Sequence, residues 1–208
     1  KPMNSYLTRF GFGVKTGIEI GEAAGVLAGP DTKSDWVEGD TIQVAIGQLT
    51  NRFTPIQLAA YAMQLANGGG RDKTHLVHSV RSYDGTVETV VEPEVADRLD
   101  IAPAILQTVR EGMVAVTKNG GTAVSSFRDA SYTVAAKTGT AQNGNGDRSD
   151  HGVFIAYAPA ENPEVAISVV MENGTSTPAH QVARQVLDAY FASKSTGTAP
   201  TPEQQLLP

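Results

Sequence analysis

One lysine, two threonines and a glycine lie close together in residues 132–142, whose sequence is YTVAAKTGTAQ. The tyrosine, threonine and valine at its start favour a β-strand. A glycine inside such a run usually marks a place where another backbone comes close. We therefore expect a strand edge that carries Lys137 beside the hydroxyls of Thr138 and Thr140. An extended ligand would lie against Gly139. The simpler alternative is a solvated lysine, which edge strands commonly use to block aggregation.

Composition excludes several classes of protein. The chain has 208 residues, of which 40% are apolar, enough for the core of one domain. Its net charge of -6 argues against nucleic acid as a partner, because phosphate binding requires clustered lysine and arginine. The absence of cysteine excludes disulfides and thiol catalysis. Because no apolar run reaches about 18 residues, we expect any membrane anchor to lie outside this chain.

Two other clusters look like ligand sites at first sight. Six glycines between residues 11 and 29 predict loop-like chain over about the first forty residues, and a second Lys-Thr-Gly triplet begins there at Lys15. A phosphate loop needs glycine directly before the lysine, where Val14 stands, so we predict a structural loop. His75 and His78 would face opposite sides of a strand. We therefore predict no metal and no cofactor.

Turn chemistry predicts two helices and a hairpin. Residues 54–70 begin with Thr-Pro, a cap and a first-turn proline, and end with Asn-Gly-Gly-Gly, which stops a buried helix. Residues 103–121 begin with proline, repeat apolar residues at helical spacing, and end with Asn-Gly-Gly. Between them, the Asp-Gly pair in residues 75–91 separates two alternating runs and predicts a small surface hairpin.

The strand that carries Lys137 is the first of three segments with short links, which predicts an antiparallel meander. A closing helix follows, with apolar residues on one face. Residues 193–208 follow this helix and are rich in Ser, Thr, Pro and Gln, so we expect them to form a disordered tail. In chain order the segments are residues 132–142, 152–158 and 165–171 for the strands and 179–190 for the helix.

The last strand segment, residues 165–171, is apolar at nearly every position. It therefore needs cover on both faces and a neighbour on its far side, since a hydrophobic edge invites aggregation. Nothing downstream can supply a fourth strand. We expect the missing strand to come from polypeptide outside this chain.

The hexapeptide KTGTAQ at residues 137–142 resembles the third signature of the penicillin-binding protein transpeptidases and serine β-lactamases, whose set is S-x-x-K, S-D-N and K-T-G. Over residues 6 to 191 the chain is similar to class B penicillin-binding proteins, of the elongation type (penicillin-binding protein 2) or a sporulation relative. The other segments that carry the likeness are Gly11-Phe12-Gly13 with Thr16-Gly17-Ile18, Trp36 with Gly39-Asp40-Thr41, Ala45-Ile46-Gly47-Gln48, Thr54-Pro55-Ile56-Gln57-Leu58-Ala59, Ala66-Asn67-Gly68-Gly69, Gly121-Thr122-Ala123, His151 with Phe154, and Tyr157-Ala158-Pro159.

The chain departs from this family at several points. Val153 stands where relatives often carry tryptophan, and Ala136 where many carry glycine. Neither S-x-x-K nor S-x-N occurs in the sequence. The resemblance therefore implies that residues 1–192 are the C-terminal portion of a transpeptidase domain. The implied fold class is α+β, a partial serine β-lactamase/transpeptidase-like fold in which this chain gives three antiparallel strands packed with helices.

The resemblance implies acyl transfer. An active serine attacks the peptide carbonyl between two D-alanines of a stem peptide, releases the last one, and passes the acyl group to an amine, while β-lactams mimic the donor. In this chemistry Lys137 supplies a positive field that attracts the terminal carboxylate of the donor. The backbone N–H of Thr140 supplies half of an oxyanion hole. The implied substrate-binding residues are Thr138, Gly139, Thr140 and Gln142.

The implied partners are the D-Ala-D-Ala stem peptide, β-lactams, and the N-terminal half of the same protein, as a separate chain or missing. The implied location is the extracytoplasmic face of the bacterial cell membrane, with an N-terminal anchor outside this chain. Alone, the chain should be inactive, because half an oxyanion hole without a nucleophile forms no acyl-enzyme. Two alternatives stay open: a non-catalytic module that binds stem peptides or a cell-wall partner, and half of a D,D-carboxypeptidase or β-lactamase.

Overall fold

The computed structural model describes residues 2–142 and 150–196. In chain order its elements are α1 (Pro2–Arg9), α2 (Glu38–Ala45), α3 (Pro55–Ala66), β1 (Gly70–Asp72), β2 (Ser79–Arg81), β3 (Val87–Val90), β4 (Val95–Arg98), α4 (Pro103–Ala115), α5 (Val124–Phe127), β5 (Ala135–Ala141), β6 (His151–Ala158), β7 (Val165–Met171) and α6 (Ser176–Thr196). The α+β class and the antiparallel meander β5-β6-β7 are confirmed.

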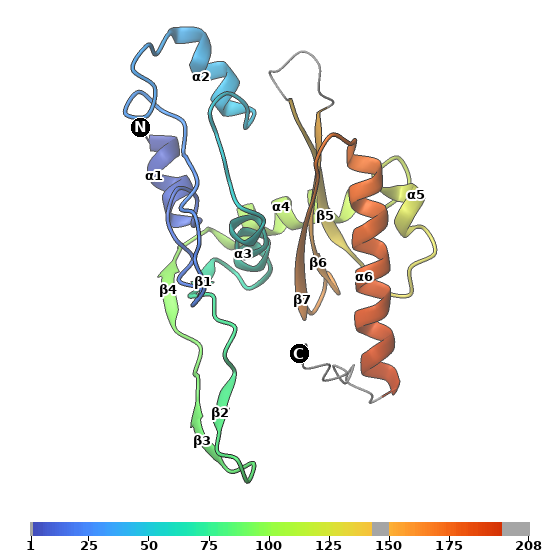
Figure 1. Cartoon of the computed structure of the whole chain (residues 1–208). Coiled ribbons are helices and arrows are strands. Elements are labelled where there is room, and N and C mark those ends of the chain that lie inside the picture. Colours follow the sequence, from blue (N-terminus) through green and yellow to red (C-terminus); the bar gives the residue numbers. More distant parts are fainter. Residues whose placement is uncertain (1, 143–149, 197–208) are drawn as a thin grey trace.

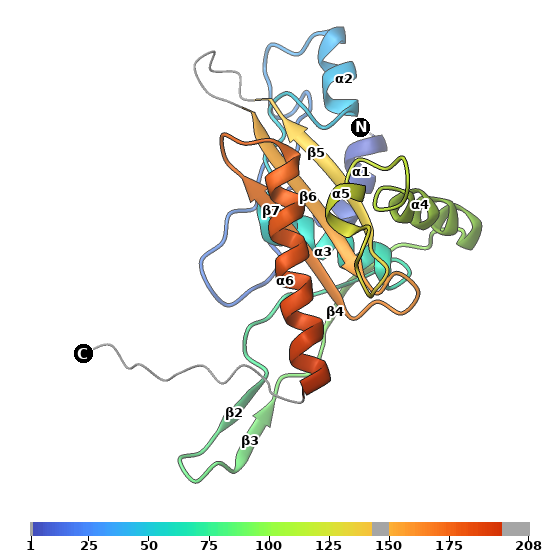
Figure 2. The same ribbon diagram turned by 90° about the vertical axis from the view of Figure 1, so that its right-hand side faces the viewer.

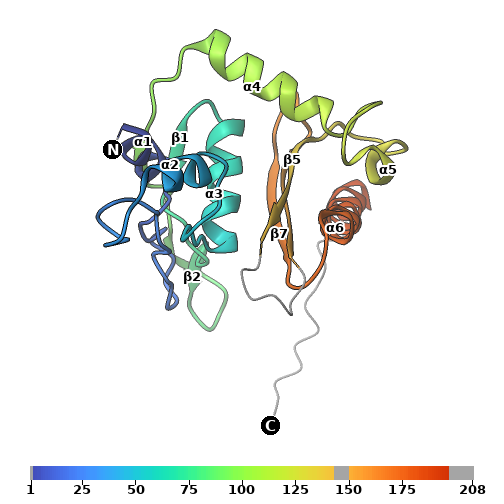
Figure 3. The same ribbon diagram turned by 90° about the horizontal axis from the view of Figure 1, so that it is seen from above.

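The central sheet is covered on both faces. Seen edge-on, it lies between α3 on one side and α6 on the other, with α4 running across its end (Figure 3). Figure 2 shows α6 lying along the sheet. Its small residues Ala179 and Ala183, together with Leu187, are fully buried at a spacing of four, where they pack against Phe154. On the opposite face Tyr157 packs against α3 and α4.

The outer edge of β7 has no neighbour within the described part of the chain, because β7 pairs only with β6 there. Its faces are covered by α3 and α6, and each of its residues is half-buried. Both faces of β7 are therefore covered, as its apolar sequence predicts. Residues 2–142 and 150–196 provide no strand that pairs with its outer edge.

The local predictions are largely confirmed. Helix α3 has Thr54 as its N-cap, proline in its first turn and Asn67 as its C-cap. The hairpin β2–β3 turns at Gly85, whose φ is 88°, and it projects from the body of the molecule (Figure 1). Helix α4 ends at Ala115, before the predicted stop at residues 119–121. No helix in the described ranges is both long and apolar enough to cross a bilayer.

Two boundaries differ from the sequence predictions. The first forty residues are not loop alone, because α1 forms there and α2 starts at Glu38. The closing helix α6 continues past Ala192 to Thr196, so residues 193–196 are helical, and the rest of the expected tail lies outside the described residues. The glycine content correctly predicted the long loop between α1 and α2, but it gave no indication of the two short helices that flank this loop.

The second Lys-Thr-Gly triplet is held by a carboxylate of the chain itself. Glu22 accepts hydrogen bonds from the N–H of Thr16 at 2.9 Å, from its hydroxyl at 2.9 Å, and from the N–H of Gly17 at 2.8 Å. Burial opposes the charge of Glu22, but these donors outweigh it and hold the pKa of its carboxyl below the usual value. The donors that a phosphate would need are therefore bound within the loop.

Gln57 connects α3 to the glycine-rich N-terminal segment. Its side chain is 1% exposed, and its Nε2 donates to the carbonyl oxygens of Gly11 at 3.3 Å, Val14 at 2.7 Å and Ala24 at 2.8 Å. Its Oε1 accepts from the N–H of Thr54 at 2.9 Å. One buried amide thus satisfies backbone carbonyls at three positions of the N-terminal segment that lie outside helices and strands.

Replacing Gln57 with leucine keeps the size of the side chain and removes these bonds. Each buried polar group left without a partner costs about 1–3 kcal/mol, so we expect the free energy of unfolding to fall by about 3 kcal/mol or more. The matched control is Gln107→Leu, because Gln107 is exposed and donates only to Glu111. That change should stay within about 0.5 kcal/mol. Equal effects in denaturant titrations would contradict the assigned role of Gln57.

Candidate functional site on the edge of β5

The pairing of β5 with β6 decides which backbone groups β5 leaves open. The carbonyl of Thr140 and the N–H of Gln142 both bind the side chain of Gln48, which lies away from β6. Backbone groups of successive strand residues point to alternate edges. Thr138 and Thr140 therefore direct their N–H groups to the open edge, while Lys137 and its odd-numbered neighbours pair with β6.

Lys137 lies on this strand opposite Ile155 of β6, with an exposed side chain. Its Nζ donates to the carbonyl of Thr138 at 2.5 Å. Alternation places its side chain on the face of Ala135, which packs toward α3 and α4. No carboxylate among the described residues forms an ion pair with Lys137. Within residues 2–142 and 150–196, its positive charge therefore has no carboxylate partner at the open edge.

Thr138 lies on the other face, where its hydroxyl is 2.9 Å from that of Thr122. The turn after α4 brings Thr122 there, and this turn requires Gly121, because a Cβ at that position would be 2.2 Å from the carbonyl oxygen of Val116. Thr122 and Gln48 had no predicted role. Both lie in segments that the family resemblance had marked, which was the signal available in the sequence.

Gly139 is a glycine that the described fold does not require. Its φ is not positive, and a Cβ built on it would come no closer than 3.4 Å to any atom, the Cβ of Val153. Gly152, which pairs with Thr140 on β6, is different, because a Cβ there would be 1.9 Å from the carbonyl oxygen of Thr175. The space beside Gly139 is therefore left free on the face that carries Lys137.

The predicted site residues lie within positions 137–142, so they all lie on β5 or directly after it. Thr140 is exposed and Gly139 is half-buried. Gln142 is exposed at the end of β5, and its N–H donates to Gln48 Oε1 at 3.3 Å. This edge offers one cation, two outward N–H donors and threonine hydroxyls. Such a set binds the oxygen-rich end of an extended anionic ligand.

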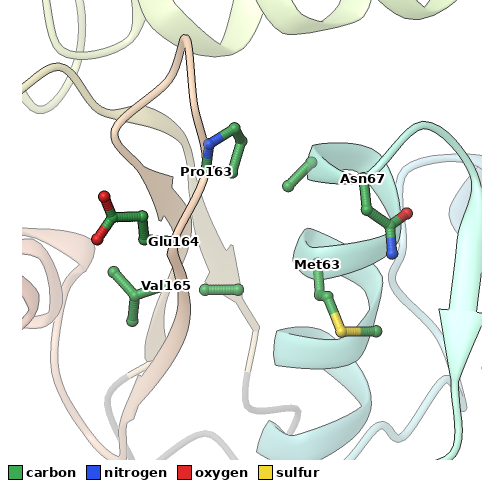
Figure 4. A pocket seen from close by; sticks show the side chains of 7 residues that line it. Met63, Asn67, Pro163, Glu164 and Val165 are labelled. Carbon is green, nitrogen blue, oxygen red and sulfur yellow. The ribbon is translucent and has the colours of Figure 1, made fainter. Parts of the chain in front are cut away.

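A cavity of about 260 Å³ lies elsewhere, between α3 and the start of β7 (Figure 4). Met63 of α3 and Asn67, the C-cap of that helix, line one side, while Pro163 and Val165 line it from the β7 side. Glu164, also in its lining, is ion-paired with Lys194. This cavity adjoins β7, at the opposite edge of the sheet from β5. The described residues contain no cluster of three or more His, Cys, Asp or Glu side chains suited to a metal ion.

Residues 1–190 match the family model described as "Penicillin binding protein transpeptidase domain". Penicillin-binding protein 2A of Bacillus subtilis (strain 168) is 38% identical over 210 residues, which cover 92% of this chain and 28% of that protein. The peptidoglycan D,D-transpeptidase MrdA of Escherichia coli (strain K12) is 34% identical over 207 residues, 89% of this chain and 32% of that protein. The chain therefore spans roughly 30% of the length of these relatives.

Solved structures are similar over most of the chain. PBP2 of Pseudomonas aeruginosa in complex with WCK 5153 superposes with a TM-score of 0.76 at 35% identity, and covers 90% of this chain and 43% of that one. Penicillin-binding protein A from M. tuberculosis, as its imipenem acyl-enzyme complex, gives a TM-score of 0.75 at 26% identity, with 90% and 41% covered.

The two glycines of the β5–β6 pair give a direct test of which one the fold requires. Gly139→Ala should change the free energy of unfolding by less than about 1 kcal/mol, because the new methyl group fits and the unfolded chain loses entropy. Gly152→Ala should cost about 2 kcal/mol or more, because the methyl overlaps Thr175. Thermal unfolding of both variants measures the difference. If Gly139→Ala lowered the free energy of unfolding as much as Gly152→Ala, the fold itself would require Gly139.

Proposed function

The chain belongs to the penicillin-binding protein transpeptidase domain family, as a class B member, and we propose that it supplies the substrate-binding strand of a peptidoglycan D,D-transpeptidase. This enzyme cross-links stem peptides by acyl transfer through a serine acyl-enzyme, and β-lactams acylate the same serine. The observation that carries the proposal is the open edge of β5, where Lys137, which forms no ion pair with the described residues, lies beside the outward N–H groups of Thr138 and Thr140.

Each residue of this edge has a physical role in the proposal. The ammonium of Lys137 attracts the terminal carboxylate of the donor peptide, and the hydroxyls of Thr138 and Thr140 donate to it. Gly139 leaves room for the ligand to pair along β5 as an added strand. The N–H of Thr140 is one of two oxyanion donors, a kind of group worth about 3–4 kcal/mol in the transition state. The side chain of Gln142 contacts the substrate beyond this point.

The remaining catalytic groups come, on this proposal, from an N-terminal half that carries S-x-x-K and S-x-N. Residues 1–192 then form the C-terminal portion of the transpeptidase domain. The outer edge of β7 pairs with no other strand of the described residues, which supports this division, because strands from the other half would pair there. The α3–β7 cavity would be closed by the same polypeptide. We place the protein at the extracytoplasmic face of the membrane, anchored by an N-terminal segment.

Fluorescent penicillin tests the proposal on the complete protein, in which this chain is joined or combined with its N-terminal half. The complete protein should become labelled, and the 208-residue chain alone should not. Lys137→Ala should lower the acylation rate about a hundredfold, the effect of losing one strong electrostatic contact to the reacting ligand. The matched control is Lys15→Ala, since Lys15 is the exposed lysine of the second Lys-Thr-Gly triplet. The acylation rate of the Lys15→Ala variant should equal that of the wild-type protein.

Two results would overturn the proposal. If Lys137→Ala and Lys15→Ala lost penicillin labelling equally, Lys137 on β5 would have no specific role in acylation. Binding of stem peptide by the complete protein without any acyl-enzyme would indicate the non-catalytic module instead. An added amine acceptor distinguishes a transpeptidase from a carboxypeptidase or β-lactamase. A transpeptidase would join the acyl group to the amine, whereas a carboxypeptidase or β-lactamase would release only the hydrolysed product.

A further inference from the structure

Another cavity, of about 310 Å³, lies where the chain leads into β5. Lys118 and Asn119 line it from the turn after α4, and Arg128 lines it from the end of α5. Tyr132 and Val134 line it from the segment just before β5. Figure 3 shows how α4 leads into α5 beside the sheet. We call this hollow the α4–β5 cavity.

The α4–β5 cavity is separate from the open edge of β5. Val134 belongs to the core on the α6 face of the sheet. Lys137 comes three residues later, so strand alternation puts its side chain on the opposite face. A ligand in this cavity would therefore not occupy the proposed substrate site.

Two cations line this cavity without a carboxylate partner. The side chains of Lys118 and Arg128 are both exposed, and neither forms an ion pair within residues 2–142 and 150–196. None of the described lining residues is an aspartate or a glutamate. The cavity thus concentrates positive charge in a chain whose net charge is -6.

The carboxylates next to the cavity are bound to other groups. Arg184 of α6 pairs with Asp129 at 2.8 Å and with Asp188 at 2.8 Å. Asp188 also accepts a hydrogen bond of 2.7 Å from the hydroxyl of Tyr132. These bonds hold both carboxylates on Arg184, away from the two cations of the cavity.

Glu161 is a further carboxylate close enough for Lys118 to influence. It accepts a hydrogen bond from the hydroxyl of Thr133 and does not line the cavity. This bond, and more weakly the charge of Lys118, lowers the pKa of Glu161. Because Glu161 is held by Thr133, Lys118 keeps its ammonium group available to a ligand.

The ends of helices offer another reason for a cation, because helix carbonyl ends carry partial negative charge. At the end of α4 these carbonyls already have donors within the chain. The carbonyl of Val114 accepts from the N–H of Thr117 at 3.2 Å and from its hydroxyl at 3.1 Å. The carbonyl of Val116 accepts from the N–H of Ala123 at 2.9 Å. The end of α4 therefore does not require the two cations.

We propose that the α4–β5 cavity binds a phosphate group. Lys118 supplies a compact positive charge, and Arg128 supplies a planar fork of donors that matches phosphate oxygens. The exposed amide of Asn119 adds a neutral donor. Two cations match a phosphate monoester, whose charge is about -1.5 to -2 at pH 7, better than a carboxylate. This inference does not rest on the proposed function.

Calorimetric titration of the complete protein with inorganic phosphate tests the site. The wild-type protein should show saturable binding in buffer that contains chloride. Lys118→Gln and Arg128→Gln should each weaken this binding at least about tenfold, because each removes a charge-assisted hydrogen bond. Without phosphate, both variants should unfold at the wild-type temperature, since both side chains are exposed.

Lys15→Gln and Arg81→Gln are the matched controls. They remove the same charges from exposed side chains that do not line the α4–β5 cavity. Both should bind phosphate as the wild-type protein does. Equal weakening in all four variants would overturn the inference, because it would show only a general attraction to positive charge. Absence of saturable binding to the wild-type protein would overturn it as well.

Two soluble phosphate esters identify the source of the group. Glycerol 3-phosphate is a monoester, and glycerophosphoglycerol is a diester that reproduces a lipid headgroup. We expect the monoester to bind more tightly, because its second charge is matched by the second cation. Tighter binding of the diester would assign the site to a lipid headgroup. Either ester should lose affinity in Lys118→Gln, and an unchanged affinity of both would contradict the site.

Discussion

The hydrogen-bonded pairing of β5 with β6 is the constraint on which the site depends. Because β6 takes the backbone groups of Lys137, Gly139 and Ala141, the N–H groups of Thr138 and Thr140 are directed outward. The same alternation puts the lysine side chain on one face and the threonine side chains on the other. A shift of one residue in this register would turn the outward N–H groups into the sheet and move the lysine to the α6 face.

The remainder of the fold holds that register. Helices α3 and α6 fix the sheet from both faces, and Gly152 lets the turn before α6 approach β6 closely. Around the edge, Gln48 and Thr122 reach β5 from segments that end α2 and α4. Gln57 ties the irregular N-terminal segment to α3. The site is therefore a short strand that is held in position by contacts with residues far from it in the sequence.

Much of this was predictable because it is encoded locally. Thr54 with its proline, the Asp84-Gly85 turn and the apolar strand runs predict their elements through capping, turn geometry and alternation. The residues proposed for the site lie within positions 137–142, so their common place on β5 and at its end follows from the sequence, while their roles stay predictions. Gln48 was not predictable, since its bonds to β5 span more than 90 residues and no local pattern encodes them. The end of α6 was misplaced because its last turns are polar, so periodicity gave no signal.

The central proposal is that the open edge of β5 receives the reacting end of a donor peptide, and that the serine that attacks this peptide belongs to polypeptide outside this chain. A crystal structure of the complete protein acylated by a β-lactam measures this most directly. The account predicts that the carbonyl oxygen of the adduct lies about 2.7–3.1 Å from the N–H nitrogen of Thr140, with the ligand carboxylate beside Lys137 and the threonine hydroxyls. An adduct on a serine of this chain, or one turned away from β5, would contradict it.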